Sequence, residues 1–154
     1  MNRRQTLRVS VVGAGACGPE TSEIARELGR LLAKRGCEVV CGGLGGVMRA
    51  VCQGAREEGG LTIGILPGAD AEAANEFVAV PIATNLGIMR NALVVGNGAV
   101  VIAVEGGSGT LSEIAMAQKT GKRVIAIGQW SALPGVVAAA SAREAVRILD
   151  ELNL

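Results

Sequence analysis

The segment AVVIAVEGGSGTLSE, residues 99–113, carries the pattern that decides the fold. Its first six residues are apolar and mostly β-branched, which is typical of a strand buried on both faces of a sheet. Glycines follow at once and allow a tight turn, and residues 110–120 are predicted to form a helix. A strand, a glycine-rich loop and a helix in this order form the repeating unit of a parallel α/β sheet.

The same alternation continues along the whole chain. Strands are predicted at residues 7–13, 37–41, 61–66, 77–82, 99–104 and 123–127, with a short last strand at 136–139. Helices are predicted at residues 19–35, 47–58, 86–95, 110–120 and 142–152. The 154 residues are too few for an eight-stranded α/β barrel, which needs about 250. We therefore predict a single α/β domain, residues 1–154, with a doubly wound, mainly parallel sheet of six to seven strands flanked by helices.

The composition disfavours several classes of function. Phe77 and Trp130 are the only aromatic residues, and the formal net charge is +1, so neither stacking platforms nor a basic nucleic-acid surface is expected. The chain has no histidine, which excludes a Ser-His triad and removes the commonest metal ligand. Its four cysteines form no CxxC pair, so we expect no metal site, and we expect Cys37 and Cys41 to pack in the core.

The N-terminal sequence MNRRQTLRV does not have the form of a secretory signal. No apolar stretch approaches the roughly 20 residues that cross a membrane. We therefore expect a cytoplasmic protein that associates with neither a membrane nor nucleic acid.

Three glycine-rich loops each follow a predicted strand and lead into a helix. In a parallel sheet the three loops lie at the same rim, where open α/β proteins bind their ligands. Glycine lets a ligand approach the backbone, and the amides at a helix N-terminus favour an anion. We predict that these loops hold a phosphorylated ligand through Gly13, Gly15, Gly42, Gly43, Gly106, Gly107, Ser108, Gly109 and Thr110.

Two common nucleotide-binding patterns are disfavoured. The first loop matches GxGxxG, but the next strand ends Val40-Cys41-Gly42-Gly43, without the acidic residue that would bind the ribose of NAD. None of the glycine loops is followed by Lys and then Ser or Thr, as a Walker loop requires.

Arg90 is an exception within a predicted helix, residues 86–95, that is otherwise apolar nearly all round. Such a helix is expected to be buried on most sides, and in a chain this small that indicates packing against a second subunit. A guanidinium in that setting needs a partner anion, either a carboxylate or a ligand phosphate.

Glu113 has two interpretations. With Thr110 as the N-cap, Thr110 to Glu113 would form a capping box in which Glu113 bonds back to the Thr110 amide. Alternatively, Glu113 lies beside the third glycine loop as a charge partner or acid/base group, a role that carboxylates take in a chain without histidine.

Three motifs resemble one superfamily: GGLGGVM at residues 42–48, IMRN at 88–91 and EGGSGTLSE at 105–113. It is the Rossmann-like superfamily formerly labelled lysine decarboxylase-like, which contains the LONELY GUY phosphoribohydrolases and the molybdenum-cofactor carrier proteins. The resemblance covers nearly the whole chain and is greatest to the carrier-like bacterial branch. Glu105 stands where the signature has proline, Ser112 where the hydrolases have a second Glu, and Asn91 where they have Lys.

The resemblance implies a Rossmann-like fold and a homo-oligomer, a dimer or tetramer, with the helix that carries Arg90 near the subunit interface. It implies binding of a phosphorylated nucleotide-like ligand, such as a nucleoside monophosphate or a pterin-type molybdenum cofactor, with no further cofactor required. The alternative is a nucleoside 5′-monophosphate phosphoribohydrolase that releases free base and ribose 5-phosphate. In that enzyme Arg90 and Glu113 would be the catalytic residues, and whether the chain is an enzyme stays open. A lysine decarboxylase is disfavoured, because nothing in the sequence indicates a pyridoxal phosphate site.

Overall fold

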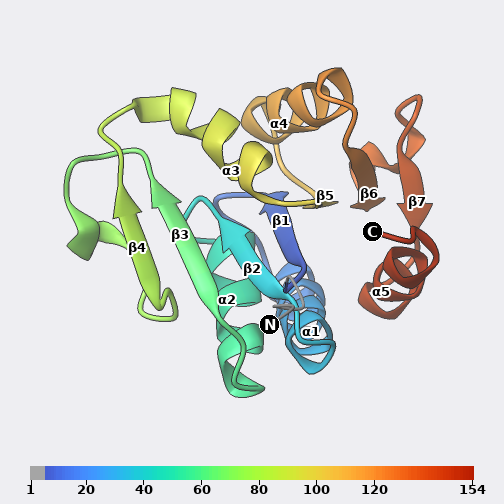
Figure 1. Cartoon of the computed structure of the whole chain (residues 1–154), viewed down its shortest axis with the longest axis horizontal. Coiled ribbons are helices and arrows are strands. Elements are labelled where there is room, and N and C mark those ends of the chain that lie inside the picture. Colours follow the sequence, from blue (N-terminus) through green and yellow to red (C-terminus); the bar gives the residue numbers. More distant parts are fainter. Residues whose placement is uncertain (1–5) are drawn as a thin grey trace, which may run out of the picture.

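The computed structural model describes residues 6–154, which form one α/β domain around a seven-stranded, wholly parallel sheet (Figure 1). The strands are β1 (Arg8–Gly13), β2 (Glu38–Cys41), β3 (Thr62–Leu66), β4 (Val80–Ala83), β5 (Val100–Val104), β6 (Arg123–Ile127) and β7 (Val137–Ala139). The α-helices are α1 (Pro19–Lys34), α2 (Val47–Glu57), α3 (Asn91–Asn97), α4 (Ser108–Lys119) and α5 (Ala142–Glu151). Short 3₁₀ turns are η1 (Ala71–Ala73), η2 (Gly87–Arg90) and η3 (Gln129–Ala132). The predicted fold class is confirmed.

The strands follow the order β4-β3-β2-β1-β5-β6-β7 across the sheet. Strands β2, β3 and β4 therefore follow one another on one side of β1, and strands β5, β6 and β7 follow one another on its other side. Helices α1, α2 and α5 pack on one face and α3 and α4 on the other, each over its own cluster of buried aliphatic residues (Figure 1). A reversal of strand order between neighbouring strands opens a crevice at their carboxyl ends, and here it falls between β1 and β5.

Most predicted elements agree with the structure to within one or two residues, and two do not. The fourth strand was predicted at 77–82 but begins at Val80, because the Asn75 carbonyl and side chain bind the amides of Val78 and Phe77 in a turn. Pro81 is accommodated because β4 is an edge strand. The predicted helix 86–95 instead consists of η2 followed by α3.

Within a single chain this segment is exposed, and its burial against a second subunit stays a prediction. Ile88 is 68% exposed and Met89 69% exposed, and no other part of residues 6–154 covers them. Cys37 and Cys41 are buried, as predicted. Within residues 6–154, none of the helices has both the length and the apolar character that a membrane crossing requires.

Helices α1 and α2 pack closely because a glycine lies at each contact. A Cβ on Gly54 would overlap the carbonyl oxygen of Arg26, and a Cβ on Gly29 would overlap that of Val51. We expect Gly54→Ala to lower the free energy of unfolding by about 3 kcal/mol, since the two backbones must separate. Gly96→Ala is the control, because a Cβ there meets no neighbouring atom and alanine favours the helix. Denaturant unfolding measures both, and equal stability of the two variants would contradict the prediction.

Candidate functional site

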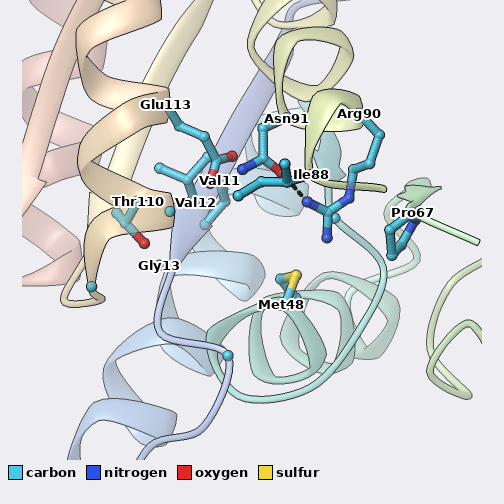
Figure 2. A pocket seen from close by; sticks show the side chains of 14 residues that line it. Val11, Val12, Gly13, Met48, Pro67, Ile88, Arg90, Asn91, Thr110 and Glu113 are labelled. Carbon is cyan, nitrogen blue, oxygen red and sulfur yellow. Dashed lines mark hydrogen bonds between the residues drawn. The ribbon is translucent and has the colours of Figure 1, made fainter. Parts of the chain in front are cut away.

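A cavity of about 410 Å³ opens at the carboxyl ends of β1, β2 and β5, beside the point where the strand order reverses. All three glycine loops contribute to its wall, together with side chains from η2, α2, α3 and α4 (Figure 2). The lining residues are Val11, Val12, Gly13, Gly15, Gly42, Met48, Pro67, Ile88, Arg90, Asn91, Gly107, Gly109, Thr110 and Glu113.

The structure brings together eight of the eleven predicted site residues. Gly13, Gly15, Gly42, Arg90, Gly107, Gly109, Thr110 and Glu113 line the cavity, whereas Gly43, Gly106 and Ser108 do not. Gly43 has a positive φ of 79° and packs against β3, where a Cβ would lie 2.8 Å from Leu66. Gly106 has a positive φ of 113°, and a Cβ there would overlap the Thr110 side chain. Ser108 is exposed outside the lining.

Backbone hydrogen bonds fix the three loops to one another. The Ala14 amide donates to the Val104 carbonyl at 3.3 Å, and the Val47 amide donates to the Ala14 carbonyl at 2.9 Å. Asn75 holds the middle loop, because its amide nitrogen donates to the Gly43 carbonyl and its side-chain Nδ2 to the Leu44 carbonyl, each at 2.9 Å. Gly13 must be glycine, since a Cβ would overlap the Val104 carbonyl oxygen. The rim is therefore a preformed cradle, which limits the entropy lost when a ligand binds.

Arg90 points into the cavity from the end of η2 (Figure 2). Its Nη1 donates to Asn91 Oδ1, but its buried Nε has no hydrogen-bond partner within residues 6–154. The guanidinium lies over Gly42, where a Cβ would come 2.7 Å from Nη2 and 2.8 Å from Met48 Sδ. Burial lowers the pKa of Arg90 and the charge of Glu113 opposes that shift, so the side chain stays cationic. A buried donor without a partner costs free energy unless a ligand supplies the acceptor.

Glu113 is not part of a capping box, and that interpretation is wrong. Helix α4 begins at Ser108 with Gly107 as its N-cap, and no side chain caps it. Glu113 therefore lies on the second turn, where its carboxyl cannot reach the first amides of the helix. Thr110 and Glu113, three residues apart, share the inward face of α4 and are only 4% and 9% exposed.

The Glu113 carboxyl faces Arg90 across the cavity, with Asn91 between them (Figure 2). Burial raises the pKa of Glu113 to about 7, and the positive charge of Arg90 opposes part of that shift. The two side chains are not within ion-pair distance among the interactions of residues 6–154. The cavity that both side chains line can admit a ligand that accepts hydrogen bonds from Arg90 and presents a polar hydrogen toward Glu113.

Glu105, which replaces the signature's proline, does not line the cavity. It has a positive φ of 51°, and its Oε2 accepts a hydrogen bond from the amide of Gln129, the first residue of η3, at 3.4 Å. Sequence reasoning also left Met48, Pro67 and Ile88 out of the candidate site, although the first and last lie within the quoted motifs. In the part of the chain that the structure describes, cysteine and acidic side chains form no cluster of three that could hold a metal ion.

Comparison with known proteins agrees with this architecture. A sequence model of the SLOG cluster4 family matches residues 6–152. The chain belongs to the SLOG cluster4 family. An uncharacterized protein from Archaeoglobus fulgidus is 41% identical over 140 residues, which are 91% of this chain and 92% of that protein.

Solved structures place this member of the SLOG cluster4 family beside molybdenum-cofactor proteins. The molybdenum cofactor binding protein from Rippkaea orientalis has a TM-score of 0.92 and 33% identity, covering 98% of this chain and 99% of that one. The molybdenum cofactor carrier protein from Chlamydomonas reinhardtii has a TM-score of 0.87 and 32% identity, covering 96% and 98%. The predicted resemblance to the carrier branch, and with it the Rossmann-like fold, is confirmed.

Proposed function

We propose that the protein binds a phosphorylated, nucleotide-like ligand of the molybdenum-cofactor type in the cavity between the glycine loops. The observation that carries this proposal is the Arg90 guanidinium, which lines the same cavity as the N-terminus of α4 and whose buried Nε has no hydrogen-bond partner within residues 6–154. An orphaned cationic donor and a helix N-terminus together favour an anion. The relatives of known structure that bind or carry the molybdenum cofactor support the choice of ligand.

The phosphate of the ligand would lie on the third glycine loop. Helix α4 has 12 residues and presents the positive end of its dipole at Gly107, the N-cap. Gly107 and Gly109 line the cavity without side chains that would shield their amides, and Thr110 lines it as well. The ring system of the ligand would then extend toward Glu113, which can accept a hydrogen bond as a carboxylate or donate one as an acid.

A second candidate function is hydrolysis of a nucleoside 5′-monophosphate to free base and ribose 5-phosphate. The pKa of Glu113, about 7, favours it, because a carboxyl poised near neutral pH suits general acid/base work. Under this alternative Glu113 would stabilise the developing oxocarbenium ion or activate water, and Arg90 would hold the ribose or phosphate. Glu113→Gln would then reduce base release about a hundredfold or more while binding persisted.

One experiment separates the two functions. The purified protein is incubated anaerobically with molybdenum cofactor and, separately, with a panel of nucleoside 5′-monophosphates. We expect molybdenum and pterin to elute with the protein in gel filtration, and no free base by liquid chromatography. Base release would establish the hydrolase instead, and retention of neither cofactor nor nucleotide would overturn the proposed ligand class.

Gly107→Asp tests the phosphate position without disturbing the fold. A Cβ at Gly107 meets no neighbouring atom, and aspartate is a favoured N-cap residue, so we expect unchanged or higher stability. The added negative charge should weaken binding of the phosphorylated ligand by about tenfold or more, because it repels the phosphate at close range. Gly107→Asn is the matched control, since it has the same size without the charge. Equal affinity of the two variants in equilibrium dialysis would show that the phosphate does not lie on the third glycine loop.

We also propose that the protein is a homo-oligomer, a dimer or tetramer. Leu86, Ile88 and Met89 form an apolar surface on η2 and its N-terminal side, and each is at least half exposed. Ile88 also lines the cavity, so a second copy seated on this surface would cover the ligand site as well. Such a surface on a single chain is typical of a protein–protein contact.

The oligomer has a direct test in solution. We expect light scattering to give two or four times the 15.6 kDa of one chain, and Met89→Asp to shift the mass to that of one chain. Leu61→Asp, on an exposed apolar residue before β3, should leave the mass unchanged. A wild-type mass of one chain at micromolar concentration would contradict the prediction.

A further inference from the structure

Two buried thiols lie directly behind the wall of the ligand cavity, and the proposed function does not use them. Cys41 is the last residue of β2 and Cys52 lies on α2, and both side chains are fully buried. Their Sγ atoms are 3.5 Å apart, a contact in which either thiol can donate the hydrogen. Gly42, which follows Cys41 in the chain, lines the cavity.

The two thiols are electrostatically different. The contact with Cys52, the Gly43 amide that donates to Sγ at 3.4 Å, and the charge of Arg90 all lower the pKa of Cys41. Burial and the negative charge of Glu113 act in the opposite direction. The contact with Cys41 and burial raise the pKa of Cys52 far above its usual range, so Cys52 keeps its proton. Because the thiolate is the nucleophile, Cys41 is the attacking thiol and Cys52 the proton-bearing partner.

The geometry requires little movement for the two sulfurs to bond. An S–S bond of about 2.05 Å needs the sulfurs to approach by about 1.5 Å from their present contact.

We propose that Cys41 and Cys52 form a reversible disulfide when the protein meets a hydroperoxide, and that this bond alters the wall of the ligand cavity. The hydroperoxide reaches the buried sulfur through a local opening of the structure, and the Cys41 thiolate attacks it, so that an S–O bond forms, the O–O bond breaks and the leaving oxygen takes a proton as water or alcohol. The Cys52 thiol then attacks the sulfenic sulfur, the S–S bond forms, and the S–O bond breaks with release of water. Two thiols lose two electrons, the hydroperoxide gains them, and a thiol reductant reverses the reaction.

The bond acts on the cavity through the residues next to each sulfur. Gly42 follows Cys41, and Met48 lies one helical turn before Cys52 on the same face of α2. Gly42 and Met48 both line the cavity against the Arg90 guanidinium. A disulfide draws these two wall elements together, so the oxidised protein holds its ligand more weakly. This last consequence rests on the proposed function, whereas formation of the bond does not.

Thiol counting tests the disulfide without any ligand. The protein is treated with hydrogen peroxide, quenched, denatured and alkylated with N-ethylmaleimide, and its intact mass is measured. The four cysteines of the reduced wild type take four labels, and we expect two after oxidation, with the peptides of Cys41 and Cys52 cross-linked. Cys37→Ser, at another buried cysteine, is the matched control and should fall from three labels to one. Four labels on the treated wild type, or a cross-link to Cys17 or Cys37, would overturn the proposal.

Two single variants test the assigned roles. In Cys52→Ser no disulfide can form, so Cys41 should gain oxygen and the mass should rise by one oxygen atom or more. In Cys41→Ser the protonated Cys52 should resist the same treatment. Oxygen gained in Cys41→Ser but not in Cys52→Ser would overturn the assignment of Cys41 as the attacking thiol.

The effect on the cavity is measured separately. The amide resonances of Gly42 and Gly43 and the methyl resonance of Met48 should shift on oxidation of the wild type and return with dithiothreitol. They should not make this change in Cys52→Ser. Cofactor retention should fall at least severalfold in the oxidised wild type. If neither form retains cofactor, the proposed function fails while the thiol count and the spectra still decide the disulfide. Unchanged spectra in a protein that carries the disulfide would overturn the coupling to the cavity.

Discussion

Replacing Arg90 by alanine is expected to lower the affinity for the molybdenum cofactor about a hundredfold or more. Arg90 is the cationic residue among those that line the cavity. Its buried Nε has no hydrogen-bond acceptor within residues 6–154. Removing one partner of a buried, hydrogen-bonded charge pair costs about 2–5 kcal/mol of binding free energy. Cofactor retained after ultrafiltration, measured as protein-bound molybdenum, gives the change in affinity.

Two further variants sharpen this test. Arg49→Ala also removes an arginine near the second glycine loop, but Arg49 is exposed and paired with Glu76, so we expect affinity near that of the wild type. Arg90→Lys keeps the charge but loses the planar fork and the Nε donor, so it should recover only part of the affinity. If the Arg90→Ala protein is folded and binds the cofactor as tightly as Arg49→Ala, Arg90 does not take part in binding.

Replacing Glu113 by glutamine is expected to stabilise the folded protein at pH 8 and to abolish a pH dependence. The pKa of the folded carboxyl, about 7, lies above its ordinary value of 4.5, so between these values the folded state binds more protons than the unfolded state. Stability must therefore fall as pH rises through this window. The shift corresponds to about 3 kcal/mol, which is present at low pH and lost above pH 7.

Denaturant unfolding at pH 5 and pH 8 measures this effect, and the absence of histidine simplifies it. The wild type should lose about 2.5 kcal/mol more than Glu113→Gln between the two pH values, which span most of the shift. Glu76→Gln is the control, because Arg49 lowers the pKa of Glu76 and that carboxyl does not titrate in the window. The same pH dependence in the wild type and Glu113→Gln would contradict a buried, protonated Glu113.

Local sequence patterns were sufficient for the architecture of the sheet. Continuous β-branched runs such as residues 100–104 indicate strands covered on both faces, and their alternation with helices leaves a parallel sheet. A parallel sheet in turn places every strand-to-helix loop of the rim at the carboxyl ends of the strands. That geometry explains why the glycine loops could be assigned to one ligand site, and why the isolated charge of Arg90 stood out in its apolar surroundings.

The ends of helices and strands were harder to predict from the sequence, because they depend on contacts outside the local pattern. The motif Thr110 to Glu113 satisfies the rule for a capping box, but α4 begins two residues earlier, at Ser108. Glu113 therefore lies on the second turn and on the buried face of α4, where burial raises its pKa. Similarly, an apolar helix near Ile88 predicts burial, but a single chain cannot supply the surface that would cover it.

The sequence by itself thus determined the parallel α/β sheet, the rim of glycine loops and the candidate charges, since each depends on periodicity or residue type within a short segment. Only the tertiary structure decided which glycines face the cavity, that Glu113 opposes Arg90, and that Cys41 touches Cys52. These arrangements join segments that are distant in the chain. Their geometry follows from the strand order that reverses between β1 and β5 and from the close packing of helices over the sheet, which no local pattern encodes.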